Sequence, residues 1–86
     1  MLFRSSGLDY GMFLQTIMLA ARARGLHTCA EAAIASFPDV VRRELGITRD
    51  SIVICGMALG YADPDAAVNT FRPERIALDE YAVFMD

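Results

Sequence analysis

The chain has 86 residues, of which 55% are hydrophobic, and a formal net charge of −3. A chain this short has room for one small domain, residues 1–86, and buries only about 60% of its unfolded surface. Its apolar content exceeds what such a core can hide, so we expect a homo-oligomer in which a partner subunit covers the excess. The acidic balance and the dispersed basic residues argue against a nucleic-acid-binding surface.

The sequence shows no sign of a membrane span, a secretion signal or a metal site. The one strongly apolar run, residues 12–21, contains Gln15 and Thr16 and is too short to cross a bilayer. The N-terminus has no basic region followed by a long apolar stretch, which indicates a cytoplasmic protein. Cys29 and Cys55 have neither CxxC spacing nor a histidine cluster nearby, so we expect buried free thiols.

The first expected element is a helix from Tyr10 to Arg24. Asp9 can cap its N-terminus, and Gly25 can adopt the left-handed conformation that ends a helix. Apolar side chains surround most of its circumference, which is typical of a helix that is buried nearly all round. His27, the single histidine, follows in a short extended link and has no second ligand or nucleophile in recognisable spacing. We therefore expect it to be a loop residue rather than a catalyst.

The middle of the chain predicts a short helix and then a buried strand. Residues 30–35 have helical propensity, but the local pattern leaves their conformation open. Pro38 suits the first position of an amphipathic helix that Gly46 ends. The continuous apolar run from Ile52 to Leu59 begins with β-branched residues, which is typical of a strand buried on both faces, and Gly60 ends it.

A polar stretch and a short apolar tail complete the chain. Asp63-Pro64-Asp65 marks a turn, and a polar loop continues from there to Arg75. The tail from Tyr81 to Met85 suits either a terminal strand or a helical turn. One strand makes no sheet, so these elements form an incomplete α+β set unless other strands pair with it.

Four segments together resemble the C-terminal half of FMN-dependent nitroreductases. They are Gly11–Leu26, Thr28–Cys29, Val40–Ile47 and Ile54–Pro64, in the order and spacing of that family. The resemblance runs from about Leu8 to the C-terminus, and the first few residues match no part of the family. It implies a partial nitroreductase-like α+β fold with a long interface helix, a short helix, a central buried strand and a C-terminal strand that crosses to the partner of a homodimer.

The resemblance also implies a flavoprotein oxidoreductase. In the family, FMN at the dimer interface takes hydride from NADH or NADPH and passes electrons to nitroaromatics, quinones or other flavins, and no side chain is an essential acid or nucleophile. The backbone of Ala32 and Ala33 corresponds to a contact near the flavin ring. Arg75, with Arg72 as the weaker candidate, corresponds to the contact with the phosphate, which guanidinium groups bind through paired hydrogen bonds. From the residues alone, the alternatives are an ordinary Ala-rich turn and a surface ion pair between Arg75 and Asp79.

Family members also carry an N-terminal segment with an Arg-Arg-Ser-x-Arg-like motif that holds the ribityl chain and the phosphate. This sequence contains nothing comparable, because Arg4-Ser5-Ser6 is too short a match. We therefore expect an incomplete flavin site that an N-terminal companion polypeptide completes, with NAD(P)H as co-substrate. The alternatives are a non-catalytic, dimerising remnant of a nitroreductase without bound flavin and, third, a small binding module for an apolar ligand.

Overall fold

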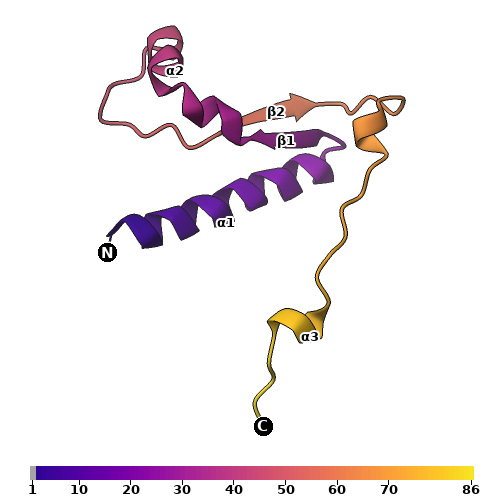
Figure 1. Ribbon diagram of the computed structural model, residues 1–86. Coiled ribbons are helices and arrows are strands. Elements are labelled where there is room, and N and C mark those ends of the chain that lie inside the picture. Colours follow the sequence, from indigo (N-terminus) through magenta and orange to yellow (C-terminus); the bar gives the residue numbers. More distant parts are fainter. Residues whose placement is uncertain (1) are drawn as a thin grey trace.

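The computed structural model describes residues 2–86, with side chains described from residue 6 onward. Along the chain, a long helix is followed by the first strand, a short second helix, the second strand and an extended C-terminal arm, and the two strands pair as an antiparallel sheet (Figure 1). The expected α+β class is confirmed. The interpretation of the N-terminus as lacking a secretion signal falls in part on residue 1, which lies outside this description, and on residues 2–5, whose side chains do.

The first helix, α1, spans Leu2–Ala23 and begins earlier than predicted. Asp9 lies inside the helix, so its prediction as the N-cap was wrong: no proline precedes it, and the helical turns continue through the polar residues before it. The C-terminal end agrees with the prediction to within one residue. Gly25 has φ 76°, and its amide donates to the carbonyl of Arg22 at 3.0 Å.

The sheet consists of β1 (His27–Glu31) and β2 (Gly56–Gly60). The register pairs the first residue of β1 with the last residue of β2. The strand predicted at Ile52–Leu59 begins at Gly56, four residues later than expected, and residues 52–55 are irregular. The predicted strand also has a neighbour, because the segment interpreted as an extended link is β1. It is not buried on both faces, since little of this chain packs over the sheet.

A 3-10 turn, η1 (Ala32–Ser36), leads from β1 into α2 (Pro38–Leu45). Residues 30–35, whose conformation the sequence left open, are thus divided between the end of β1 and η1. The predicted limits of α2 are confirmed. Gly46 follows it with φ 66°, and its amide donates to the carbonyl of Arg42.

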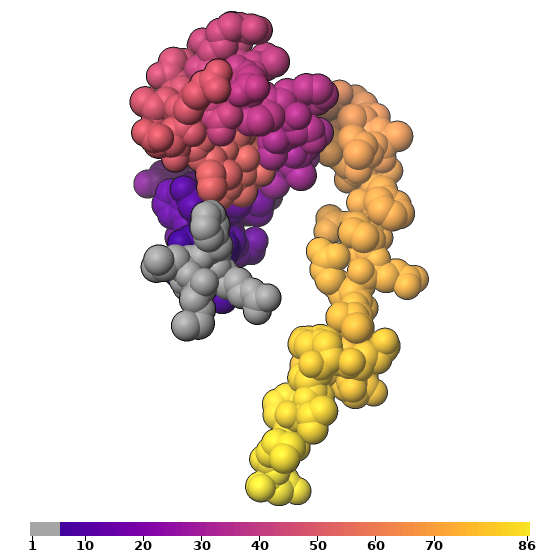
Figure 2. Space-filling view, turned by 60° about the vertical axis from the view of Figure 1, so that its left-hand side comes forward, coloured from indigo at the N-terminus to yellow at the C-terminus, as the bar shows by residue number. Residues whose placement is uncertain are grey.

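After β2 the chain leaves the sheet as an extended arm. Residues 71–77 have no regular structure, α3 (Leu78–Tyr81) is a single helical turn, and residues 82–86 are again irregular. Figures 1 and 2 show that this arm, residues 71–86, extends away from the rest of the molecule. The radius of gyration is 16.9 Å, against about 12 Å for a compact chain of this length. The arm is therefore not packed against its own chain.

Little of the molecule is buried. The solvent-accessible surface is 8040 Å², whereas a folded monomer of this mass exposes about 5,000 Å². Among the side chains described, only Ala21 of α1 is buried. Cys55 is half-buried and Cys29 is exposed, so the expectation of a buried thiol was wrong for Cys29, because its strand is left largely uncovered.

Among residues 2–86, none of the helices is long and apolar enough to cross a membrane. The same residues contain no group of three or more side chains that could hold a metal ion.

Candidate functional site

Arg72 and Arg75 lie three residues apart on the arm and line one shallow concavity of about 550 Å³. The other lining residues are Val68, Asn69, Phe71 and Pro73. Pro73 has no amide hydrogen and restricts its own φ, which limits the freedom of the stretch between the two arginines. Both arginines are exposed, and neither has an ionic partner within the described part of the chain. The arm therefore presents two guanidinium groups that are available to an anion.

The surface ion pair considered from the residues alone is not formed. Asp79 lies in the first turn of α3. In the chain from residue 6 onward, no salt bridge joins its carboxylate to Arg75. Binding of an anion by Arg75 therefore does not have to compete with this carboxylate.

Ala32 and Ala33 begin η1, directly after β1, and both are exposed. Their neighbour Ile34 packs against β2 at Gly56: its Cγ1 lies 3.2 Å from where a Cβ on that glycine would stand. The amide of Phe37 donates to the carbonyl of Ile34 at 3.2 Å and closes the turn. The backbone at Ala32 and Ala33 is thus positioned by the packing of Ile34, not by their own methyl groups.

The structure does not bring the two predicted contact groups together within one copy. The antiparallel register places the pair of Glu31 with Gly56 at one end of the sheet and the pair of His27 with Gly60 at the other. The η1 turn follows the first end, and the arm leaves beyond the second (Figure 1). The predicted ring contact and the predicted phosphate contact therefore flank opposite ends of the sheet.

His27 has a structural contact that sequence reasoning missed. It is the first residue of β1, not a loop residue, and its Nδ1 accepts a hydrogen bond from the amide of Ala62 at 3.2 Å. Ala62 begins a compact segment, residues 62–70, which we call the exit turn because it joins β2 to the arm. No local pattern signals this contact, because 35 positions separate the two residues.

The exit turn is held together by its own polar groups. The side-chain amide of Asn69 donates to the carbonyl of Asp63 at 2.7 Å, and the amide of Asp65 donates to the Asp63 carboxylate at 2.9 Å. The Thr70 hydroxyl donates to the carbonyl of Ala67 at 2.7 Å. The predicted turn at residues 63–65 is therefore the start of a longer ordered connection.

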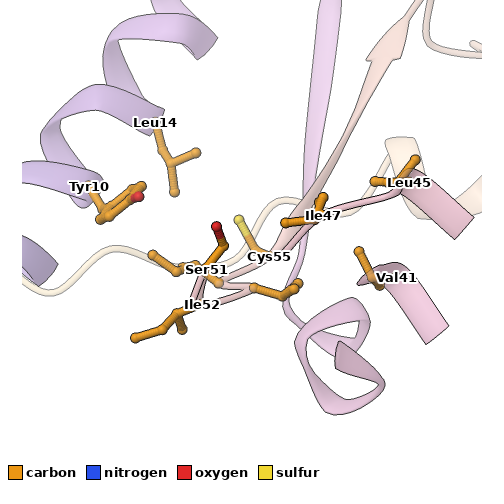
Figure 3. A pocket seen from close by; sticks show the side chains of 10 residues that line it. Tyr10, Leu14, Val41, Leu45, Ile47, Ser51, Ile52 and Cys55 are labelled. Atoms are coloured by element: carbon orange, nitrogen blue, oxygen red, sulfur yellow. The ribbon is translucent and has the colours of Figure 1, made fainter. Parts of the chain in front are cut away.

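A second concavity, of about 280 Å³, is apolar and lies between α1 and the α2 region (Figure 3). Tyr10 and Leu14 project from α1 toward the segment that carries Ile52 and Cys55. The lining residues are Tyr10, Leu14, Val41, Leu45, Ile47, Ser51, Ile52, Val53, Ile54 and Cys55. No charged side chain is among them, so this concavity suits the packing of apolar groups and offers a phosphate no charged partner.

Comparison with known protein families decides the assignment. The sequence model of the nitroreductase family matches residues 3–61. The chain belongs to the nitroreductase family. The match begins at residue 3, so the expectation that the first few residues match no part of the family was wrong.

Among curated nitroreductases, a 4-nitrobenzoate reductase of Pseudomonas putida is 45% identical over 80 residues, which are 93% of this chain and 35% of that protein. The chloronitrobenzene nitroreductase of Comamonas testosteroni is 43% identical over 81 residues, which are 94% of this chain and 36% of that protein. The chain thus spans roughly a third of the length of these relatives.

Solved nitroreductase structures share the fold. The FMN and NADPH-dependent nitroreductase NfnB of Sphigopyxis sp. strain HMH superimposes with a TM-score of 0.89 at 37% identity, covering 94% of this chain and 36% of that one. The FMN-dependent NfnB of Mycobacterium smegmatis, in complex with NADPH, gives 0.88 at 39% identity, with coverages of 93% and 36%. The partial nitroreductase fold is therefore confirmed. Because so little of this chain is left out of the match, most of the extended arm belongs to the shared fold.

Proposed function

We propose that this chain supplies the C-terminal part of a single nitroreductase domain and acts, once that domain is complete, as an FMN-dependent oxidoreductase. Its substrates are NAD(P)H and nitroaromatic or quinone-type acceptors. The relatives named above support this class of reaction, and two of them are described as FMN-dependent. The observation that carries the proposal is that Arg72 and Arg75 line one concavity of the arm and that neither forms a salt bridge in the described part of the chain.

The residues present fit part of an FMN site. Arg75 would hold the phosphate, with Arg72 as the weaker contact, because a guanidinium group binds phosphate oxygens through charge-assisted hydrogen bonds. The backbone at Ala32 and Ala33 lies against the flavin ring. FMN, when bound, supplies the chemistry of hydride acceptance and electron delivery, and the protein holds and orients it. We therefore assign no catalytic acid, base or nucleophile to this chain.

We further propose a cytoplasmic homodimer in which the arm of one copy reaches the other. The chain exposes about 3,000 Å² more than a folded monomer of its mass, an excess that a second copy and the rest of the domain together would cover. Much of this surface is apolar and on the arm, where Val83 is 84% exposed and Phe84 78% exposed. Dimerisation also accounts for the two contact groups at opposite ends of the sheet, because arm and η1 need not come from the same copy. The N-terminal part of the domain, which the relatives have and this sequence does not span, would supply the remaining contacts.

Flavin affinity tests the phosphate site. FMN and riboflavin differ only in the phosphate, so FMN is expected to bind the assembled protein more tightly. Arg75→Ala should weaken FMN about ten- to a hundredfold, since a hydrogen bond to a charged group contributes roughly 1.5–3 kcal/mol, and should leave riboflavin unchanged. Arg72→Ala should have a smaller effect. Arg24→Ala, which removes an exposed arginine just after α1, controls for net charge.

Two results would count against the proposed FMN site. Equal affinities for FMN and riboflavin in the unmodified protein would contradict a phosphate site on the arm. Purified protein that stays colourless with added FMN, yet still dimerises, would support the alternative of a non-catalytic dimerising remnant.

Measurements of NAD(P)H oxidation test whether the chain needs the N-terminal part of the domain for activity. The assay is oxidation of NADH and NADPH with a nitroaromatic acceptor and added FMN, on this chain alone and with a co-expressed N-terminal part of a similar enzyme. Little turnover is expected from the chain alone, because a loosely held flavin is poorly placed for hydride transfer. Turnover is expected when the N-terminal part is present. Family-like turnover by the chain alone would show that it needs no further part of the domain.

A further inference from the structure

The hydrogen bond from the Ala62 amide to His27 Nδ1 joins the start of the exit turn to the end of the sheet. The other side-chain hydrogen bonds of the exit turn, described above, stay within it. Among the described residues, this is the one side-chain hydrogen bond that connects the exit turn to β1. Ala62 lies two residues after the end of β2.

The surroundings of His27 place the exit turn over this end of the sheet. A concavity of about 410 Å³ is lined by His27 together with residues of both strands and with Asn69 of the exit turn. Asn69 also lines the concavity that holds Arg72 and Arg75. The exit turn therefore lies between the His27 contact and the two arginines, so a change in its orientation moves both guanidinium groups.

We propose that His27 is a positioning residue: by accepting the Ala62 amide, its Nδ1 fixes the direction in which the arm leaves the sheet, and so the place where Arg72 and Arg75 meet an anion. The role requires an acceptor at the Nδ1 position. The backbone amide of Ala62 can only donate, so an imidazole that carries a proton on Nδ1 does not make this contact. The part of the proposal that concerns anion binding rests on the proposed function; the part that concerns the arm does not.

Three substitutions of His27 separate the acceptor from the rest of the side chain. Asn places its Oδ1 where Nδ1 stands, Gln places its acceptor one bond further out, and Leu has none. The first measurement is amide exchange by NMR on the assembled protein, read at Ala62 and along the arm. Exchange at Ala62 should rise about three- to tenfold in His27→Gln and His27→Leu, and return close to the original value in His27→Asn.

The second measurement is the ratio of FMN to riboflavin affinity in the assembled protein. That ratio should fall in His27→Gln and His27→Leu and be restored in His27→Asn, with riboflavin affinity unchanged throughout. A general loss of structure would weaken both flavins together. The contrast of Asn with Gln holds even if His27→Leu does not fold, because both are uncharged amides that differ in the position of the acceptor.

The two measurements separate the two proposals. If Asn and Gln give the same exchange at Ala62, His27 does not hold the arm and the inference is overturned, whatever happens to flavin. If Asn protects Ala62 but the unmodified protein does not prefer FMN, the phosphate site is wrong and the role of His27 in holding the arm stands. If exchange follows the acceptor but the flavin ratio does not, His27 orders the exit turn without positioning the arginines, which overturns the second half of the inference.

Discussion

The side chain of Ile34 fills the space that a Cβ on Gly56 would need, so a glycine in β2 is what allows η1 to lie against the sheet. The requirement is one of packing and not of backbone conformation, because only Gly25 and Gly46 have positive φ among the described residues. Through this contact, β2 sets the position of the backbone at Ala32 and Ala33.

Gly56→Ala is expected to push Ile34 away and to lower the free energy of unfolding of the assembled protein by about 1–3 kcal/mol, the usual cost of overpacking. Ile34→Ala leaves only its Cβ near position 56, 3.6 Å from the new Cβ, which is ordinary contact. The double variant should therefore lose less stability than the two single variants together. Urea unfolding of the four proteins measures this coupling, and strict additivity would show that the two side chains do not compete for space.

Arg42 should matter more to stability than the salt bridge it makes. Its guanidinium donates to the carbonyl of Ser51 at 2.9 Å and to the carboxylate of Asp39 at 3.2 Å. Asp39 is 84% exposed, so Asp39→Ala should cost well under 1 kcal/mol. Arg42→Ala also frees the segment after α2 and should cost about 1.5–3 kcal/mol. Chemical unfolding distinguishes the two; equal losses would mean that the bond to Ser51 contributes nothing.

Gly46 is expected to tolerate asparagine better than alanine. Its φ of 66° lies in the left-handed region, where a Cβ costs roughly 1–2 kcal/mol. Gly46→Ala should therefore lower the unfolding midpoint, and Gly46→Asn should lower it less, because asparagine ends helices in this conformation. Nothing lies within 4 Å of the added Cβ, so sterics against neighbours do not confuse the comparison. Equal midpoints for both variants would mean that the backbone relaxes at this position.

Deleting residues 81–86 should weaken self-association. The deletion removes Tyr81, Val83, Phe84 and Met85, whose side chains are all 64% exposed or more and have no cover in their own chain. Sedimentation at low micromolar concentration should show the dimer dissociating at higher concentrations than before. Circular dichroism should change little, because the removed residues include only the last residue of α3. Association that is unaffected by the deletion would count against an arm that crosses to the partner.

Elements with strong local signals were predictable from the sequence. Pro38 and Gly46 bound α2 as expected, and Gly25 ends α1, because a proline start and a left-handed glycine are encoded within a few residues. The beginning of α1 was predicted wrongly because the local signal was misleading there. Asp9 has the chemistry of a cap, but nothing before it interrupts the helix.

Contacts between distant residues were not predictable from local pattern. The pairing of β1 with β2, the seat of Ile34 on Gly56 and the bond from Ala62 to His27 each join residues more than 20 positions apart. The resemblance to nitroreductases named Arg72, Arg75, Ala32 and Ala33 as site residues, and these assignments stay predictions. That the two groups flank opposite ends of the sheet depends on the register, which a residue-by-residue resemblance does not convey.

The two-stranded sheet has a consequence for how this protein is made. Each strand is paired on one side only within the described residues, which leaves two rows of backbone amides and carbonyls open to any extended segment that comes near. Such edges template non-native pairing as readily as native pairing. Chains synthesised in excess of the segments that normally cover them should therefore collect in inclusion bodies, and co-expression with a covering partner should recover soluble material.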